Sequence, residues 1–96
     1  MKRLEVITLR HTRETEQDKV IDLLHQVRTL SPANIYEIKL YRHSELDNDL
    51  SIHLRWINDG SGEQKSTLGQ QLVHELREFG LVHRAVWIEE TLNDHE

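Results

Sequence analysis

Residues 34–58 read NIYEIKLYRHSELDNDLSIHLRWIN, and this stretch decides the fold. Apolar and polar residues alternate in each of its two halves, which is typical of strands whose two faces differ. The apolar sides are Tyr36, Ile38 and Leu40 in the first half and Leu50, Ile52, Leu54 and Trp56 in the second. The segment SELDND between the halves is polar and suits a turn. The stretch therefore predicts a β-hairpin.

The segment before this hairpin predicts one strand and one helix. Residues 3–11 carry apolar and β-branched side chains without helical spacing, which favours a strand buried on much of both faces. Between residues 15 and 29, apolar side chains recur every three or four positions, as in an amphipathic helix. Pro32 ends this helix, because proline disfavours helical geometry at the residue before it.

The segment after the hairpin begins with NDGSGEQKST, residues 58–67, which has the composition of a phosphate-binding loop. Such a loop needs Gly directly before its Lys-Ser/Thr pair, but Gln64 precedes Lys65 here. We therefore expect a polar loop that binds no nucleotide, with Ser66 or Thr67 capping the helix that follows.

A second helix and a last strand complete the chain. Helical spacing of apolar residues continues over residues 66–79, and Gly80 stands where a left-handed residue commonly closes a helix. The segment LVHRAVWIEE, from residue 81, is rich in β-branched and aromatic residues and predicts the last strand. Residues from about 91 onward are expected to fray.

The elements follow in the order βαββαβ within a single domain of 96 residues. Right-handed crossovers and the central hairpin predict a ferredoxin-like α+β fold, a four-stranded antiparallel sheet with both helices on one face. The opposite face would expose Tyr41, Ile57 and Trp87. A second sheet packed face to face would cover them, so we expect a homodimer with a central cavity.

Composition limits the classes of partner. The formal net charge is −5 and the pI about 5.8, which argues against nucleic acid because phosphates need a basic face. The absence of cysteine excludes disulfides, thiolate metal sites and a thiol nucleophile. No stretch has the apolar length of a membrane span, and the charged start MKRLEVITLRH has no signal-peptide run. We expect a cytoplasmic protein without membrane association.

Seven histidines are the most unusual feature of the composition, and four of them fall in predicted strands. These four are His11, His43, His53 and His83. Metal sites commonly show two His at i and i+4 on a helix or H-x-H on a strand, and neither spacing occurs here. We therefore predict no dedicated metal site and interpret these histidines as half-buried strand residues that hydrogen-bond across the sheet or to water.

Two segments, KSTLGQQL at 65–72 and EFGLVHRAVWI at 78–88, resemble the dimeric α+β-barrel superfamily, in particular small bacterial proteins grouped with the antibiotic biosynthesis monooxygenase-like domains. The element order extends this resemblance over the whole chain. It implies a homodimer whose two sheets enclose a barrel, with ligands held in each protomer between sheet and helices. It does not imply one reaction, because this fold hosts quinone-forming monooxygenases, haem-degrading enzymes, dismutase-like enzymes and proteins with no known activity.

On this resemblance we expect a small aromatic or quinol-like ligand in a cleft between sheet and helices, oxidised without metal, flavin or other cofactor. Such a site needs an apolar pocket with a few polar groups that hold oxygens and move a proton. Residues with this chemistry are Tyr41, His53, Arg55 and Trp87. Each also has an ordinary role, with the two aromatics in a dimer interface and Arg55 as a cross-strand partner of Glu37 or Glu89.

Other functions stay open. Haem-degrading members of the superfamily use a helix histidine as axial ligand with a distal tryptophan, and His74 and Trp56 are the matching residues here. The other alternative is a non-catalytic dimer that senses a small molecule, such as an amino acid, or has a structural role. An RNA-recognition domain shares the element order, but LSIHLRWIN lacks its run of aromatic and basic residues.

Overall fold

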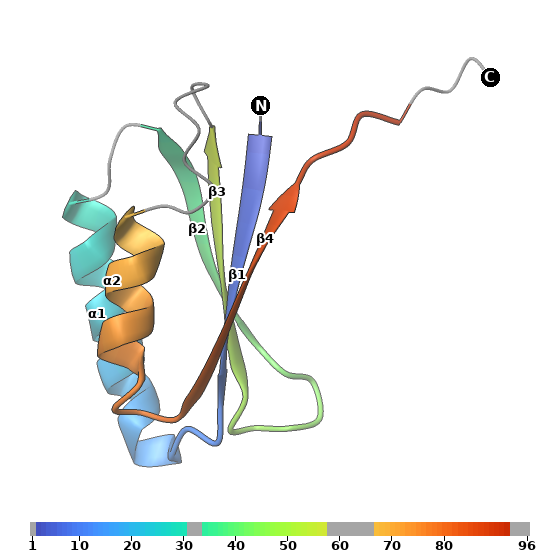
Figure 1. The fold of residues 1–96 in the computed structure, drawn as a ribbon. Helices are drawn as coiled ribbons and strands as arrows, with labels where there is room; N and C mark the ends of the chain where they lie inside the picture. Colours follow the sequence, from blue (N-terminus) through green and yellow to red (C-terminus); the bar gives the residue numbers. More distant parts are fainter. Residues whose placement is uncertain (1, 31–33, 58–66, 93–96) are drawn as a thin grey trace.

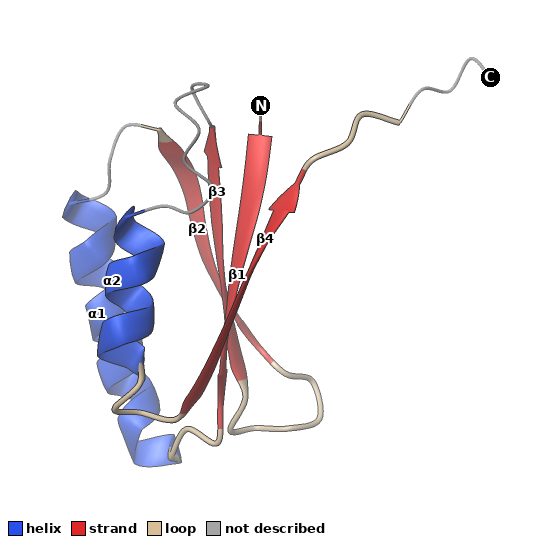
Figure 2. Ribbon diagram, viewed as in Figure 1, coloured by secondary structure: helices blue, strands red, loops and turns tan. Residues whose placement is uncertain are grey.

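The structure is a computed structural model that describes residues 2–30, 34–57 and 67–92. Its elements are β1 (Lys2–Arg10), α1 (Glu14–Leu30), β2 (Ile35–Arg42), β3 (Leu50–Ile57), α2 (Thr67–Leu76) and β4 (Leu81–Ile88). The strands form one antiparallel sheet in the order β2-β3-β1-β4. Both helices cover the same face of this sheet, so the molecule has two layers (Figure 1, Figure 2). The predicted ferredoxin-like α+β fold is confirmed.

The hydrophobic core lies between the sheet and the helices. The alternation predicted for β3 is confirmed, because its even-numbered residues from Leu50 to Trp56 are all buried. The buried residues that pack with them are Ile7 and Leu9 of β1, Val20, Leu24 and Val27 of α1, Ile35 of β2, and Leu68, Leu72 and Leu76 of α2. We call the other side of the sheet, which no helix covers, the open face.

The start of β2 departs from the predicted alternation. Ile35 pairs with Trp56 and Glu37 pairs with Arg55, so the register shifts between Ile35 and Glu37. This β-bulge turns Ile35 into the core, where it is 8% exposed, and leaves Tyr36 49% exposed. The prediction that Tyr36 lies on the core side is therefore wrong.

The second helix is shorter than predicted. It ends at Leu76, and in the turn that follows, the Phe79 N–H donates to the Leu76 carbonyl at 2.9 Å. Gly80 does not adopt the left-handed conformation expected of a helix-closing residue. Glycine is needed there for another reason, because a Cβ would overlap the backbone oxygen of Arg10. Of the two predicted caps, Ser66 lies outside the described residues and Thr67 is the first residue of α2.

Asp49, directly before β3, joins the hairpin to the corner between β1 and α1. Its Oδ1 accepts the backbone N–H of His11 and its Oδ2 accepts the Nε–H of Arg10, both at 3.2 Å. His11 has a φ of 63°, in the left-handed region that non-glycine residues rarely adopt. The hydrogen bond from His11 lowers the pKa of Asp49, and Arg10 lowers it further. The corner is thus tied to the hairpin through one carboxylate.

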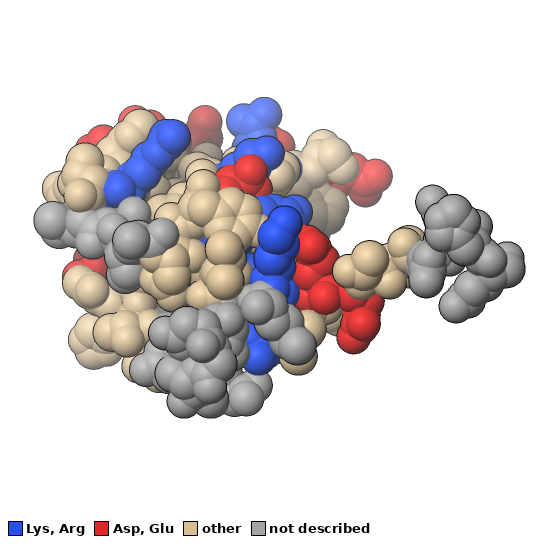
Figure 3. Space-filling model, turned by 90° about the horizontal axis from the view of Figure 1, so that it is seen from above, with Lys and Arg blue, Asp and Glu red and all other residues tan. Residues whose placement is uncertain are grey.

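The surface carries charge of both signs. In the end-on view of Figure 3, a row of Lys and Arg side chains lies beside a group of Asp and Glu side chains. Such mixed charge on this end of the molecule differs from the single-sign basic surface that binds nucleic acid. Neither helix among the described residues has the length and apolar character needed to cross a membrane.

Candidate functional site

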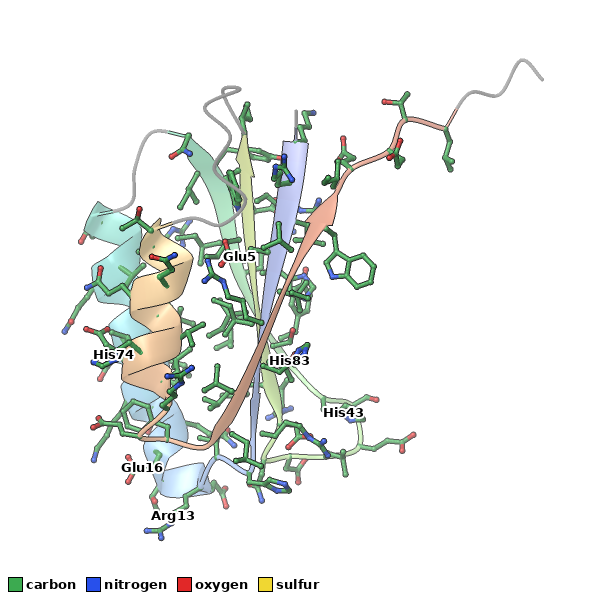
Figure 4. The ribbon with its side chains drawn as sticks, in the orientation of Figure 1. Glu5, Arg13, Glu16, His43, His74 and His83 are labelled. Atoms are coloured by element: carbon green, nitrogen blue, oxygen red, sulfur yellow. The ribbon has the colours of Figure 1, made fainter. Side chains whose placement is uncertain are left out.

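Two charged residues of β1 lie on the helix-facing side of the sheet. Because side chains alternate along a strand, Arg3 and Glu5 share this side with Ile7 and Leu9. Arg3 is 7% exposed and Glu5 is 0% exposed. Figure 4 shows Glu5 between α2 and the sheet. A charge buried in this way needs a compensating partner, because removing it from water is costly.

One partner of Glu5 is Arg84 of β4. The Nε–H of Arg84 donates to Oε2 of Glu5, and the Arg84 side chain is 12% exposed. Helix α2 passes directly over this pair, since a Cβ at Gly69 would overlap the Glu5 carboxylate and lie 2.7 Å from Nη2 of Arg84. Glycine at this position therefore lets the helix backbone approach a buried ion pair. The ion pair fills the space beneath this part of α2.

Arg3 and Trp56 form a second polar contact on the same side of the sheet. They are partners in the β1–β3 register, and the Arg3 guanidinium lies 5.9 Å from the centroid of the Trp56 ring, within cation–π range. Trp56 is 2% exposed. Both Nε of Arg3 and Nε1 of Trp56 are buried, and neither has a hydrogen-bond partner among residues 2–30, 34–57 and 67–92. Buried donors nearly always have an acceptor, so these two mark a place where a ligand oxygen could be held.

The sequence alone did not point to Arg3, Glu5 or Arg84. Apolar residues on both sides of β1, such as Leu4 and Val6, hid the alternation that places the two β1 charges toward the helices. Glu5 and Arg84 are 79 positions apart, so no local pattern connects them. One signal was present in the sequence. Glu5 is separated from Ile7 and Leu9 by even numbers of positions, so it shares their side of the strand, and a charged residue on a buried side needs a partner.

The four residues predicted to line a cleft between sheet and helices lie on the open face instead. These are Tyr41, His53, Arg55 and Trp87. In β3 the even-numbered residues are buried against the helices, so His53 and Arg55 must face the other way. The predicted location in the cleft is therefore wrong. Their part in ligand binding stays a prediction.

Tyr41 and His53 contact each other across neighbouring strands. Their ring centroids are 4.5 Å apart with the planes inclined by 48°, and Nε2 of His53 lies 3.1 Å from Oγ of Ser51. Burial lowers the pKa of His53, the positive charge of Arg55 lowers it further, and Glu37 opposes the shift. His53 is therefore mainly neutral near neutral pH and can accept a proton or a hydrogen bond.

Arg55 and Trp87 are not part of this contact. Nε of Arg55 donates to Oε1 of Glu37 at 2.8 Å, which confirms the cross-strand ion pair predicted as its ordinary role. Trp87 is separated from Arg55 by a strand, because both pair with Leu4 of β1. Its side chain is 61% exposed. The four predicted residues thus share a face without forming one cluster.

The haem alternative requires His74 and Trp56 to face one ligand. His74 is exposed on α2, and Figure 4 shows it on the helical layer, whereas Trp56 is buried against the sheet. The structure does not bring the two residues together. Of the four histidines predicted in strands, only His53 and His83 are strand residues. Within the described parts of the chain, no three His, Asp or Glu side chains are grouped so as to hold a metal ion.

Comparison with known proteins gives a clear result for the fold. The sequence matches no protein-family profile and no curated protein. SnoaB, a cofactor-independent oxygenase from Streptomyces nogalater, is 11% identical, with a TM-score of 0.65 over 98% of this chain and 97% of SnoaB. A predicted antibiotic biosynthesis monooxygenase from Deinococcus radiodurans is 12% identical, with a TM-score of 0.65 over 100% of both chains. Another, from Bordetella bronchiseptica, is 14% identical, with a TM-score of 0.64 over 95% of this chain and 98% of that one.

The chain has the antibiotic biosynthesis monooxygenase-like fold. The resemblance predicted from residues 65–72 and 78–88 is thereby confirmed at the level of the fold. Identities of 11% to 14% with these three structures carry no residue roles from one protein to the other. The chemistry of this protein therefore has to follow from its own side chains.

Proposed function

We propose that the protein binds a small aromatic molecule beside Arg3 and Trp56, between the sheet and the helices, and oxidises it without a cofactor. The observation that carries this proposal is the pair of buried donors, Nε of Arg3 and Nε1 of Trp56, for which the described part of the chain supplies no acceptor. A phenol or quinone oxygen would supply that acceptor, and the indole ring offers an apolar contact. The shared fold with a cofactor-independent oxygenase supports the reaction class.

Arg3 would contribute to the reaction through its charge. A guanidinium next to a bound phenol stabilises the phenolate, so the phenol proton is released to water. The electron-rich phenolate then transfers electrons to dioxygen, and one oxygen atom bonds to the ring carbon para to the phenolate oxygen. The C–H bond at that carbon and the O–O bond break, and the second oxygen takes up two protons, equal in number to those lost from the hydroxyl and this carbon. In the balanced reaction, a dihydroxynaphthalene and one O₂ give a hydroxynaphthoquinone and one water. One oxygen atom enters the ring as a carbonyl and the other leaves as water.

The proposal includes a homodimer formed through the open face. Four large apolar side chains on this face are strongly exposed, namely Tyr41 at 45%, Ile57 at 46%, Leu81 at 65% and Trp87 at 61%. A second copy of the same sheet, packed face to face, would cover these four side chains symmetrically.

The oxidation is tested with a protein whose only tryptophan is Trp56, made by Trp87→Phe. Titration with a dihydroxynaphthalene should quench the Trp56 emission saturably, and one O₂ should be consumed for each quinone formed. Arg3→Met should weaken quenching and remove oxygen uptake, while the matched Arg13→Met, at an exposed position before α1, should change neither. Circular dichroism confirms that each variant is folded.

Three outcomes separate the candidate functions. Saturable quenching without oxygen uptake favours the non-catalytic, ligand-sensing alternative. Quenching by haem alone, lost in His74→Ala, favours the haem alternative. No quenching by any phenol, quinone or haem contradicts ligand binding at Trp56 altogether.

A further inference from the structure

A separate pocket of about 340 Å³ lies at the hairpin end of the sheet. Leu50 lines it, whereas Trp56 is at the opposite end of β3, roughly 20 Å away along the strand. Figure 1 shows the connection between β2 and β3 leaning away from the helices at this end of the sheet. Tyr41, one of the lining residues, also belongs to the open face that the proposed dimer would use. Its volume is at the lower end of the about 300–1,000 Å³ usual for small-molecule sites.

One part of the pocket wall is apolar. The apolar residues in the lining are Tyr41, Leu46 and Leu50. Leu50 is 4% exposed and belongs to the core, whereas Leu46, in the hairpin connection, is 49% exposed and Tyr41 is 45% exposed. Two large apolar groups therefore stand open to solvent beside a buried one, which favours an occupant with an apolar or aromatic body.

The imidazole of His43, also in the lining, has a defined tautomer. Its Nδ1 accepts the backbone N–H groups of Glu45 and Leu46, each at 3.0 Å. Since Nδ1 acts as the acceptor in both bonds, the ring proton is on Nε2. His43 therefore has one N–H left to donate to a ligand.

Two arginines belong to the lining, Arg10 at the end of β1 and Arg42 at the end of β2. Arg10 is bound to Oδ2 of Asp49, and the other oxygen of Asp49 accepts the His11 N–H, so the one carboxylate of the lining is already occupied. Arg42 has no ion pair with any carboxylate in the described parts of the chain. The lining thus offers donors and a surplus positive charge, in a protein whose formal net charge is −5.

We infer that this pocket binds a small aromatic carboxylate. Its ring would lie against Leu46 and Tyr41, and its carboxylate would accept hydrogen bonds from Arg42 and His43, near Arg10. Planar guanidinium groups match a carboxylate in geometry as well as charge. The apolar wall distinguishes such an acid from a bare anion, and the cationic side distinguishes it from a neutral arene. This site is additional to the one beside Trp56.

The test is a titration of ¹⁵N-labelled protein with 1-naphthoate, followed by the amide signals of Thr8, Leu46 and Ser51. We expect saturable shifts centred on these residues. Arg42→Gln should weaken the affinity at least about tenfold, as expected for loss of a charge-assisted hydrogen bond. Leu46→Ser should weaken it several-fold by removing the apolar wall. Arg77→Gln makes the same charge change at an exposed position after α2 and should leave the affinity unchanged.

Neutral 1-naphthamide and inorganic phosphate are the ligand controls, and each should bind at least about tenfold more weakly than 1-naphthoate. The inference is overturned if 1-naphthoate causes no saturable shift, if naphthamide binds equally well, or if Arg77→Gln and Arg42→Gln have equal effects. It is distinguishable from the proposed oxidation, because Trp56 emission reports that site and Arg42→Gln should leave the Trp56 titration unchanged.

Discussion

The carboxylate of Asp49 accepts the backbone N–H of His11 at 3.2 Å and so holds a left-handed residue at the corner between β1 and α1. Only the ionised carboxylate accepts at both oxygens, and its pKa in the folded protein is lowered mainly by this bond. The stability that results is present above the ordinary pKa of 3.8 and is lost as pH falls through the lowered value.

Asp49→Asn should therefore lower the melting temperature at neutral pH and flatten its decline below pH 3.8. Asp47→Asn changes an exposed carboxylate in the same connection and should alter neither. Thermal melts followed by circular dichroism across the acid range measure both effects. Parallel pH profiles for Asp49→Asn and the unmodified protein would contradict the assignment.

His53 should make the protein sensitive to mild acid. Its pKa is lowered from 6.5 by burial and by Arg55, so the folded state resists protonation more than the unfolded state does. The resulting stability is complete above pH 6.5 and declines as pH falls through the lowered pKa. His53→Gln should reduce the loss of melting temperature between about pH 7 and about pH 5. The control His83→Gln, at an exposed position in β4, should retain the full loss.

Gly69→Ala should destabilise the protein even though alanine is the better helix former. The gain in helix propensity is about 1 kcal/mol. Against it, the new Cβ would overlap the Glu5 carboxylate, and displacing one member of a buried ion pair costs about 3–5 kcal/mol. We expect a net loss of at least about 2 kcal/mol in the free energy of unfolding. Gln70→Ala, at the exposed neighbouring position, should be neutral or stabilising in the same urea titration.

Replacing both Glu5 and Arg84 by apolar residues should preserve stability, whereas replacing Glu5 alone should not. Glu5→Leu removes the carboxylate from Arg84, which is 12% exposed, and should lower the free energy of unfolding by about 3–5 kcal/mol. Glu5→Leu combined with Arg84→Met should restore stability to within about 1 kcal/mol, because an apolar pair avoids desolvating charge. If the double variant is as unstable as the single one, the pair has a role beyond mutual neutralisation.

Trp87 should hold the dimer together if the open face is its interface. Trp87→Ser should shift the mass measured by light scattering at micromolar concentration from dimer toward monomer, since tryptophan is a frequent anchor of interface energy. Tyr36→Ser is the comparison, because Tyr36 is 49% exposed but lies at the bulge of β2. A monomer mass for the unmodified protein would contradict the dimer.

The sequence by itself determined the kind and order of the elements, because period-2 and helical spacing are local properties of the chain. The even-numbered residues of β3 from Leu50 to Trp56 show this, since they are buried as their alternation predicts. Local spacing gave the wrong burial for residues whose position depends on how two strands pair. The bulge that turns Ile35 inward and leaves Tyr36 exposed arises in the register with β3, on which the sequence of β2 carries no information.

The candidate sites were decided only by tertiary structure. The four residues chosen for their chemistry, His53 among them, were assigned to the wrong side of the sheet, because their own strand alternation places them opposite the helices. Glu5 and Arg84 meet across 79 positions through the pairing of β1 with β4, under a helix that only Gly69 allows so close. Pairing and helix placement bring distant residues together, and no local pattern in the sequence encodes these contacts.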